Sequence, residues 1–166
     1  MIKAIETNYG GYRFRSRLEA RWAVFFDELG IEWEYEKEGY EDGGVCFLPD
    51  FYLPNIGVRT PGGCFVEIKA NEEEIKNNEQ KFFMLGKSKN LIVFPGLYDV
   101  ENPNGYDYSR GGWDNSMGFL DCATCGAIRI DYMMESNYRN CLECFTDEMT
   151  DDNIIESVLK ARAERF

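Results

Sequence analysis

The stretch 49–69 constrains the fold more than any other part of the chain. It contains two short apolar runs joined by a connection rich in proline and glycine, a pattern that predicts two neighbouring strands. Asp50 lies on the first predicted strand, and Glu67 and Lys69 lie on the second. Because side chains two residues apart share a face of a strand, Glu67 and Lys69 point the same way. The sequence therefore predicts two carboxylates and a lysine at one point, which is the outline of a metal site.

The hydrophobic patterns around this pair of strands predict an α/β unit. A first helix is expected from the capping-box spacing of Ser16 and Glu19 and from an apolar stripe that ends at Gly30. The predicted elements, in order, are a helix at 16–30, strands at 32–37, 46–53 and 64–70, a helix at 71–87 and a strand at 91–94. We expect an antiparallel meander followed by a right-handed crossover to a parallel strand. The predicted fold class is α/β, with a mixed four-stranded sheet.

The rest of the chain divides into three segments after a core that spans residues 1–96. Glycines and prolines interrupt the aromatic segment 97–120, which we expect to be a loop packed over the core; stacking of nucleobases is the alternative. We expect residues 121–149 to form a small zinc-binding module and residues 150–166 to form an amphipathic helix at the C-terminus.

The zinc-binding module is predicted from two Cys-x-x-Cys pairs with 15 residues between them. These pairs are Cys122 with Cys125 and Cys141 with Cys144. Four thiolates complete a tetrahedron around Zn²⁺, and a site filled entirely by protein ligands is structural. Disulfides or free core thiols are the alternative. Cys46 and Cys64 have no such partners and are expected to be buried in strands.

The charge of the chain limits the kinds of partner it can bind. Its 166 residues carry a formal net charge of −12, and residues 91–166 hold 6 basic against 14 acidic side chains. This excludes a protein that coats nucleic acid by charge alone and leaves a basic protein partner open for the acidic C-terminal part. Histidine is absent, so the chemistry falls to carboxylates, lysines, tyrosines or cysteines.

The location expected from the sequence is cytoplasmic. No run of about 18 apolar residues is present to span a bilayer, so no membrane partner is expected. The first residues lack the apolar core of a secretion signal, and we expect the protein not to be secreted.

A group of arginines at the start of the first predicted helix is the one place where basic and aromatic residues interleave. These arginines are Arg13, Arg15, Arg17 and Arg21, with Tyr12 and Phe14 between them. The pattern favours contact with nucleic acid, and a solvated helix start is the alternative.

Pro49-Asp50, Glu67-Ile68-Lys69 and the predicted α-β-β-β-α-β order together resemble the PD-(D/E)XK nuclease superfamily. The resemblance covers about residues 12–95 and implies a restriction-endonuclease-like core. The cysteine segment lies outside this core and resembles an appended zinc ribbon or knuckle.

The resemblance implies a Mg²⁺ or Mn²⁺ ion held by Asp50 and Glu67, with help from the Ile68 carbonyl. Oxygen ligands and one or two carboxylates suit this ion. Lys69 would orient the attacking water and stabilise developing charge, because carboxylates nearby favour its charged form. Many members of the superfamily also use a glutamate from the first helix, and Glu19 is placed for this role.

Glu19 has a second interpretation, because the capping box with Ser16 would turn its carboxylate back to the helix start. The central motif also has an alternative, in which Asp50 ends a strand while Glu67 and Lys69 form a solvated strand face. Both alternatives stay open at this point.

The function expected from these features is a metal-dependent nuclease, acting as an endonuclease on phosphodiester bonds in DNA. A bacterial or phage-infected cell is the setting that analogy suggests. The alternative is a catalytically inactive nuclease-like protein whose acidic surface imitates DNA or docks on a basic partner. A zinc-ribbon regulator that uses the core as a scaffold is a third hypothesis, and fold alone does not choose among them.

Overall fold

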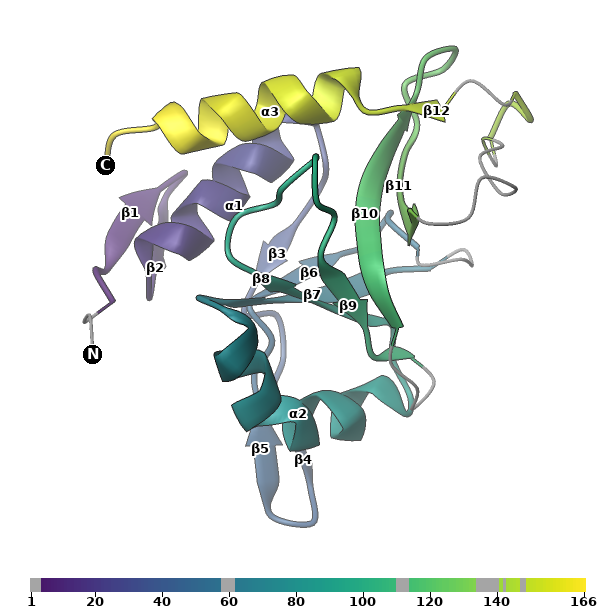
Figure 1. Ribbon diagram of the computed structural model, residues 1–166. Helices are drawn as coiled ribbons and strands as arrows, with labels where there is room; N and C mark the ends of the chain where they lie inside the picture. The colour runs from purple at the N-terminus through teal and green to yellow at the C-terminus, as the bar shows by residue number, and fades with distance from the viewer. Residues whose placement is uncertain (1–3, 58–61, 110–113, 134–140, 142, 147–148) are drawn as a thin grey trace.

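The computed structural model in Figure 1 describes residues 4–57, 62–109, 114–133, 141, 143–146 and 149–166. A mixed sheet forms the centre of this part of the chain, and helices lie on both of its faces. Helices α1 (Arg17–Glu28) and α3 (Asp152–Ala163) pack side by side on one face, and α2 (Glu72–Gly86) covers the other. The predicted α/β class is confirmed. None of the helices in these residues combines the length and the apolar character needed to cross a membrane.

The predicted unit of four strands forms one half of the sheet. It consists of β3 (Glu34–Tyr35), β6 (Phe51–Leu53), β7 (Cys64–Lys69) and β8 (Leu91–Pro95). Strand β6 is antiparallel to β3 and to β7, and β8 is parallel to β7, as the meander and crossover predict. Helix α2 lies between β7 and β8 in the chain and makes this connection.

The predicted size of the sheet is wrong, because the described residues form eight strands in it instead of four. The additional strands are β9 (Gly105–Asp107), β10 (Asp114–Cys122), β11 (Ile128–Tyr132) and β12 (Met149–Thr150). Two of them begin within segment 97–120, which was predicted as a loop. The glycines and prolines of this segment interrupt the strand pattern, so the three-residue β9 and the start of β10 were not predicted. Tyr98, Tyr108 and Phe119 are buried, as expected for rings that cover a core, and Trp113 lies outside the described residues.

Two hairpins lie outside the main sheet. They are formed by β1 (Thr7–Tyr9) with β2 (Tyr12–Phe14) and by β4 (Tyr40–Asp42) with β5 (Val45–Phe47). Each turn consists of two glycines with positive φ, which suits a two-residue hairpin loop. Figure 1 shows the second hairpin extending away from the sheet beside α2.

The predicted strand 46–53 is therefore wrong as a single element. It divides into β5 and β6 around Pro49, which has no N–H to donate to a ladder. Cys46 is exposed on β5 instead of buried, whereas Cys64 is buried on β7 as predicted. Within the connection between β6 and β7, residues 58–61 lie outside the described part of the chain.

The apolar stripe of the first helix forms the centre of the larger core. Trp22, Phe25 and Phe26 are fully buried, and the Trp22 Nε1–H donates a hydrogen bond of 3.0 Å to the Gly96 carbonyl. This bond joins α1 to the residue that follows β8. The N-terminus of α1 is thereby fixed over the end of β7 and β8 that carries the charged residues described below.

Substitution of Gly86 by alanine is expected to destabilise the fold by roughly 1 to 3 kcal/mol, because a Cβ would lie 2.0 Å from the Tyr108 carbonyl oxygen. The sign is unusual, since alanine normally stabilises a helix relative to glycine by about 1 kcal/mol. Urea denaturation measures the change. Gly39→Ala is the control, because its Cβ meets only the Phe47 carbonyl oxygen at 3.9 Å. Equal midpoints for the two variants would contradict the close approach of α2 to Tyr108, the residue after β9.

Candidate functional site

The register of β6 and β7 brings Asp50 and Glu67 together. Phe51 pairs with Val66, so Asp50, one residue earlier, lies opposite Glu67. The Asp50 backbone N–H donates to Glu67 Oε2 at 3.1 Å, and the Ile68 backbone N–H donates to Asp50 Oδ2 at 2.7 Å. Each carboxylate is thus held by the backbone of the other strand. The two acidic residues singled out by the sequence are neighbours in space.

Both carboxylates are almost completely shielded from solvent. Asp50 is 2% exposed and Glu67 is 3% exposed. Burial raises the pKa of Asp50 well above its ordinary value, and the charge of Glu67 raises it further. Burial also raises the pKa of Glu67, although the charge of Lys69 opposes this shift. Two buried negative charges close together are unfavourable, and a cation beside them relieves that cost.

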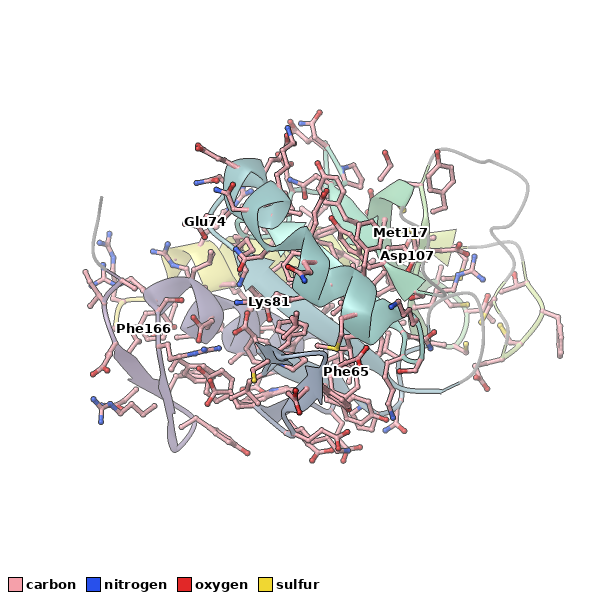
Figure 2. All side chains as sticks on the ribbon, turned by 90° about the horizontal axis from the view of Figure 1, so that it is seen from below. Phe65, Glu74, Lys81, Asp107, Met117 and Phe166 are labelled. Carbon is pink, nitrogen blue, oxygen red and sulfur yellow. The ribbon has the colours of Figure 1, made fainter. Side chains whose placement is uncertain are left out.

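Lys69 supplies one such cation. Its Nζ forms an ion pair with Glu67 Oε1, and its side chain is 18% exposed. Because Glu67 and Lys69 alternate with Val66 and Ile68 along β7, they share a face with Phe65, which packs in the smaller core beneath α2. Figure 2 shows α2 lying across this face of the sheet. The solvated strand face that the sequence left open is not what these residues form.

Arg15 supplies the second cation. It lies between β2 and α1, and its Nη2 is 2.6 Å from Asp50 Oδ1. Its Nε is 2.9 Å from Glu36 Oε1. Of the four predicted arginines, this is the one that the structure places against a predicted carboxylate.

Among the described residues, no hydrogen bond or ion pair is seen between the other three predicted arginines and Asp50 or Glu67. Arg13 is 71% exposed and forms an ion pair with Glu6, while Arg17 is exposed on the first turn of α1. Arg21 is half-buried, and its Nε has no hydrogen-bond partner within the described residues. Their contact with nucleic acid stays a prediction.

The carboxylate of Glu19 forms hydrogen bonds with residues near the start of α1. Its Oε1 accepts from the Ser16 hydroxyl at 2.6 Å, its Oε2 accepts from the Tyr35 hydroxyl at 2.6 Å, and Ser16 caps the helix by accepting from the Glu19 N–H. Burial, together with the bond to Glu19, raises the pKa of Tyr35, which keeps the phenol a donor. This is the capping alternative. A metal role for Glu19 stays a prediction and requires its carboxylate to leave these partners.

Glu36 is a residue of the site that the sequence analysis did not single out. It has a φ of 47°, which is uncommon for a residue other than glycine, and its backbone N–H donates to the Asp50 carbonyl at 2.9 Å. The strand of β3 ends at Tyr35, so this turn places Glu36 beside Arg15. The turn was not predicted, because Glu36 continues the alternation of the residues before it and was therefore included in the predicted strand 32–37.

The four cysteines of the two pairs converge on one point. Their sulfur atoms all lie within 4.8 Å of one another, with 3.6 Å between Cys122 and Cys144 and 3.5 Å between Cys125 and Cys141. A zinc tetrahedron with bonds of about 2.3 Å has sulfurs about 3.8 Å apart. The group can therefore hold a zinc ion. It is the only group of three or more His, Cys, Asp or Glu ligands that converges in the described part of the chain.

The two cysteine pairs have the same backbone arrangement. The N–H of Gly126 donates to the Cys122 carbonyl at 2.8 Å, and the N–H of Phe145 donates to the Cys141 carbonyl at 2.9 Å. Both donors have positive φ, of 72° and 60°. Each pair is thus a tight knuckle that presents two sulfurs, which supports the prediction of four ligands from two similar turns.

Hydrogen bonds and burial shift the pKa values of the cluster in both directions, raising those of Cys125 and Cys144 and lowering that of Cys141. Burial raises the pKa of Cys141, but hydrogen bonds from the N–H groups of Cys144 and Glu143 outweigh this effect and lower the pKa to about 7. A thiolate is the form of cysteine that binds a metal. Cys122 is the last residue of β10, so the cluster is attached to the main sheet.

In comparisons with known proteins, no family model, curated protein or solved structure matches the chain.

Proposed function

We propose that the protein is a metal-dependent nuclease that hydrolyses phosphodiester bonds, with DNA as its substrate. The observation that carries the proposal is the pairing of buried Asp50 with buried Glu67 beside Lys69. The chain order α1-β3-β6-β7-α2-β8 and the Pro49-Asp50 and Glu67-Ile68-Lys69 sequences support it, since both resemble the PD-(D/E)XK nucleases. Removing two carboxylates and most of a lysine side chain from water costs free energy. A strand with only a structural role would have no need of these three charged side chains.

The donor set fits a hard divalent cation. Asp50 and Glu67 offer oxygen ligands, and Mg²⁺ is commonly bound by one or two carboxylates plus water and phosphate. Each of their four oxygens accepts one hydrogen bond from the described residues, and a carboxylate oxygen can accept more than one, so capacity for a cation remains. A bound cation would lower the pKa of water and stabilise charge on phosphate oxygens.

The residues of the chain have separable roles in this proposal. Asp50 and Glu67 hold the cation, and the Ile68 carbonyl, which accepts a hydrogen bond of 3.4 Å from Lys69 Nζ, is the further ligand that the resemblance implies. Lys69, held by its ion pair with Glu67, would donate a hydrogen bond to the attacking water or to a phosphate oxygen. The buried position of the carboxylates keeps bulk water from weakening these interactions.

The four-cysteine group supports the module around β12 rather than the reaction. With four protein ligands it leaves no open position for a substrate, which is the property of a structural zinc. We propose Zn²⁺ as its metal and Mg²⁺ or Mn²⁺ as the cation of the carboxylate site.

Incubation with nucleic acid tests the function. We expect cleavage of at least one DNA substrate in Mg²⁺ or Mn²⁺ and none in EDTA, with single-stranded, double-stranded, flapped and branched DNA compared beside RNA. Lys69→Gln is expected to slow cleavage by about 100-fold or more, because it removes a charged donor at the reacting phosphate. Gel analysis of end-labelled substrates measures the rates.

The matched control is Lys76→Gln, which removes a lysine charge from the exposed face of α2. Its cleavage rate is expected to stay within about twofold of the original. No metal-dependent cleavage of any substrate would reject the nuclease and favour an acidic protein that docks on a basic partner.

A further inference from the structure

One arginine spans three carboxylates at the edge of the candidate metal site. The Arg15 Nη2 contacts Asp50 Oδ1 at 2.6 Å, and its Nε contacts Glu36 Oε1 at 2.9 Å. The same Nε lies 3.9 Å from Glu19 Oε2. A planar guanidinium with several donors suits this arrangement better than the single point charge of a lysine.

Arg15 binds the oxygen of Asp50 that accepts no backbone N–H, Oδ1, and a side chain can vacate its position more easily than a strand backbone can. The other oxygen, Oδ2, accepts the Ile68 backbone N–H at 2.7 Å, a bond fixed by the pairing of β6 with β7. The Asp50 side chain is 3% exposed and the Arg15 side chain is 55% exposed. The guanidinium therefore lies on the solvent side of the carboxylate, where an incoming cation would approach.

Arg15 can leave Asp50 without a change in the backbone. The backbone N–H of Arg15 donates to Glu19 Oε2 and to the Tyr35 hydroxyl, each at 3.2 Å. These bonds fix the Arg15 Cα at the junction of β2 and α1. The long side chain is the movable part. Glu36 can retain the Nε end of the guanidinium while the Nη end turns away.

The formal charges of the site also favour an exchange. Four carboxylates, those of Glu19, Glu36, Asp50 and Glu67, face the two cations Arg15 and Lys69, which leaves a formal charge of −2. A divalent cation brings this sum to zero. The guanidinium is then no longer needed at Asp50 to limit the repulsion between carboxylates, and it becomes available to an anion.

We propose that Arg15 and a divalent cation are alternative partners of Asp50 Oδ1. Binding of the cation displaces the Arg15 Nη2 from Asp50, Glu36 keeps the side chain at the edge of the site, and the released donors bind a phosphate of the nucleic acid. The proposal rests on the metal site of the proposed function but not on cleavage. It makes Arg15 a residue that couples metal binding to substrate binding.

Calorimetric titration with Mn²⁺, without nucleic acid, tests the competition. Arg15→Ala is expected to bind Mn²⁺ about fivefold or more tightly than the original protein, because a charge-assisted hydrogen bond no longer competes for Asp50. Arg17→Ala removes an equal charge from the same helix start without emptying Asp50, and its affinity should change less than about twofold. Arg15→Lys keeps the charge and should lie between the two.

Binding of a fluorescein-labelled DNA duplex in Ca²⁺ tests the phosphate contact. Arg15→Ala is expected to weaken it by about fivefold or more, opposite in sign to its effect on Mn²⁺. Mn²⁺ binding by Arg15→Ala that is no tighter than that by Arg17→Ala, or an absence of Mn²⁺ binding altogether, would overturn the exchange. Inactivity toward every nucleic acid would reject the nuclease while leaving the Mn²⁺ result to decide this proposal.

Discussion

Asp50→Asn is expected to abolish metal-dependent cleavage and, at the same time, to stabilise the metal-free protein. Loss of a ligand that holds the cation should lower the rate by about 1,000-fold or more, since a metal ion supplies several kcal/mol of charge stabilisation. The carboxylate is 2% exposed and lies next to Glu67, so its charge is a cost to the fold. Asparagine keeps an oxygen for the Ile68 N–H and removes the charge.

The sign of the stabilisation follows from the direction of the pKa shift. The charged carboxylate is disfavoured in the folded protein and the neutral amide is not, so we expect the variant to unfold at a higher temperature or urea concentration than the original at neutral pH in EDTA. Thermal or urea denaturation measures this difference. Because Arg15 is half-exposed and keeps Glu36 as a partner, the substitution leaves no buried cation unpaired.

The pH dependence of stability gives an independent check on the sign. The pKa values of Asp50 and Glu67 are raised in the folded protein, so the folded state holds protons that the unfolded state has released. The contribution of the pair is greatest below the ordinary carboxylate pKa and is lost as the pH rises through the raised values. In EDTA, Asp50→Asn should reduce this loss, and the gap between the two proteins should widen with pH.

A matched substitution separates this effect from a general loss of negative charge. Asp42→Asn removes one carboxylate charge from the exposed strand β4, and its stability should change by less than about 0.5 kcal/mol. An Asp50→Asn protein that is less stable than the original in EDTA would mean that the buried carboxylate contributes a favourable pair. In that case the burial of Asp50 would have a structural explanation.

The parts of the site that could be predicted from sequence are those fixed by strand periodicity. Glu67 and Lys69 share a face because they are two residues apart in β7, and the length of the connection lets Asp50 stand opposite Glu67. The Arg15 contact with Asp50 joins residues 35 positions apart. No local pattern distinguishes Arg15 from Arg13 or Arg17, so only tertiary structure could select it.

Other features lay beyond sequence patterns for identifiable reasons. Strand β9 has three residues and is stabilised by pairing with β8 and β10, which no short window contains. In the sequence, Glu36 continues the alternation of a strand. In the structure its φ is positive, because contacts with Arg15 and Asp50 favour a turn at this residue. Cys46 looked like part of a buried strand, yet β5 belongs to a separate hairpin and leaves it exposed.

Removal of zinc from the four-cysteine group is expected to loosen the connection between β10 and β12. Cys122 ends β10, and Cys141 and Cys144 precede β12, so one ion would join segments that are far apart in the chain. Metal binding to such sites contributes on the order of 10 kcal/mol in isolated zinc-binding peptides, and part of this energy should stabilise the fold here. Cys141→Ser should therefore lose the zinc and several kcal/mol of stability.

The cysteines that lie outside the group provide the control for this prediction. Cys46→Ser changes an exposed thiol and should keep about one zinc per chain, measured by elemental analysis. A thiol reagent should react rapidly with Cys46 alone while zinc is bound, because the four ligands are coordinated and Cys64 is buried. After chelation, the four ligand thiols should react as well.

The reaction of thiols also distinguishes zinc from the alternatives of disulfides and free thiols. Free cysteines would react without chelation to the extent that they are exposed, beginning with Cys125 and Cys144. Disulfides would react only after reduction and would hold no metal. Rapid reaction of several thiols in protein that contains no zinc would reject the structural metal, and the knuckles would then owe their geometry to backbone hydrogen bonds alone. Retention of the fold on chelation, with zinc released, would instead limit the ion to a local role at the end of β10.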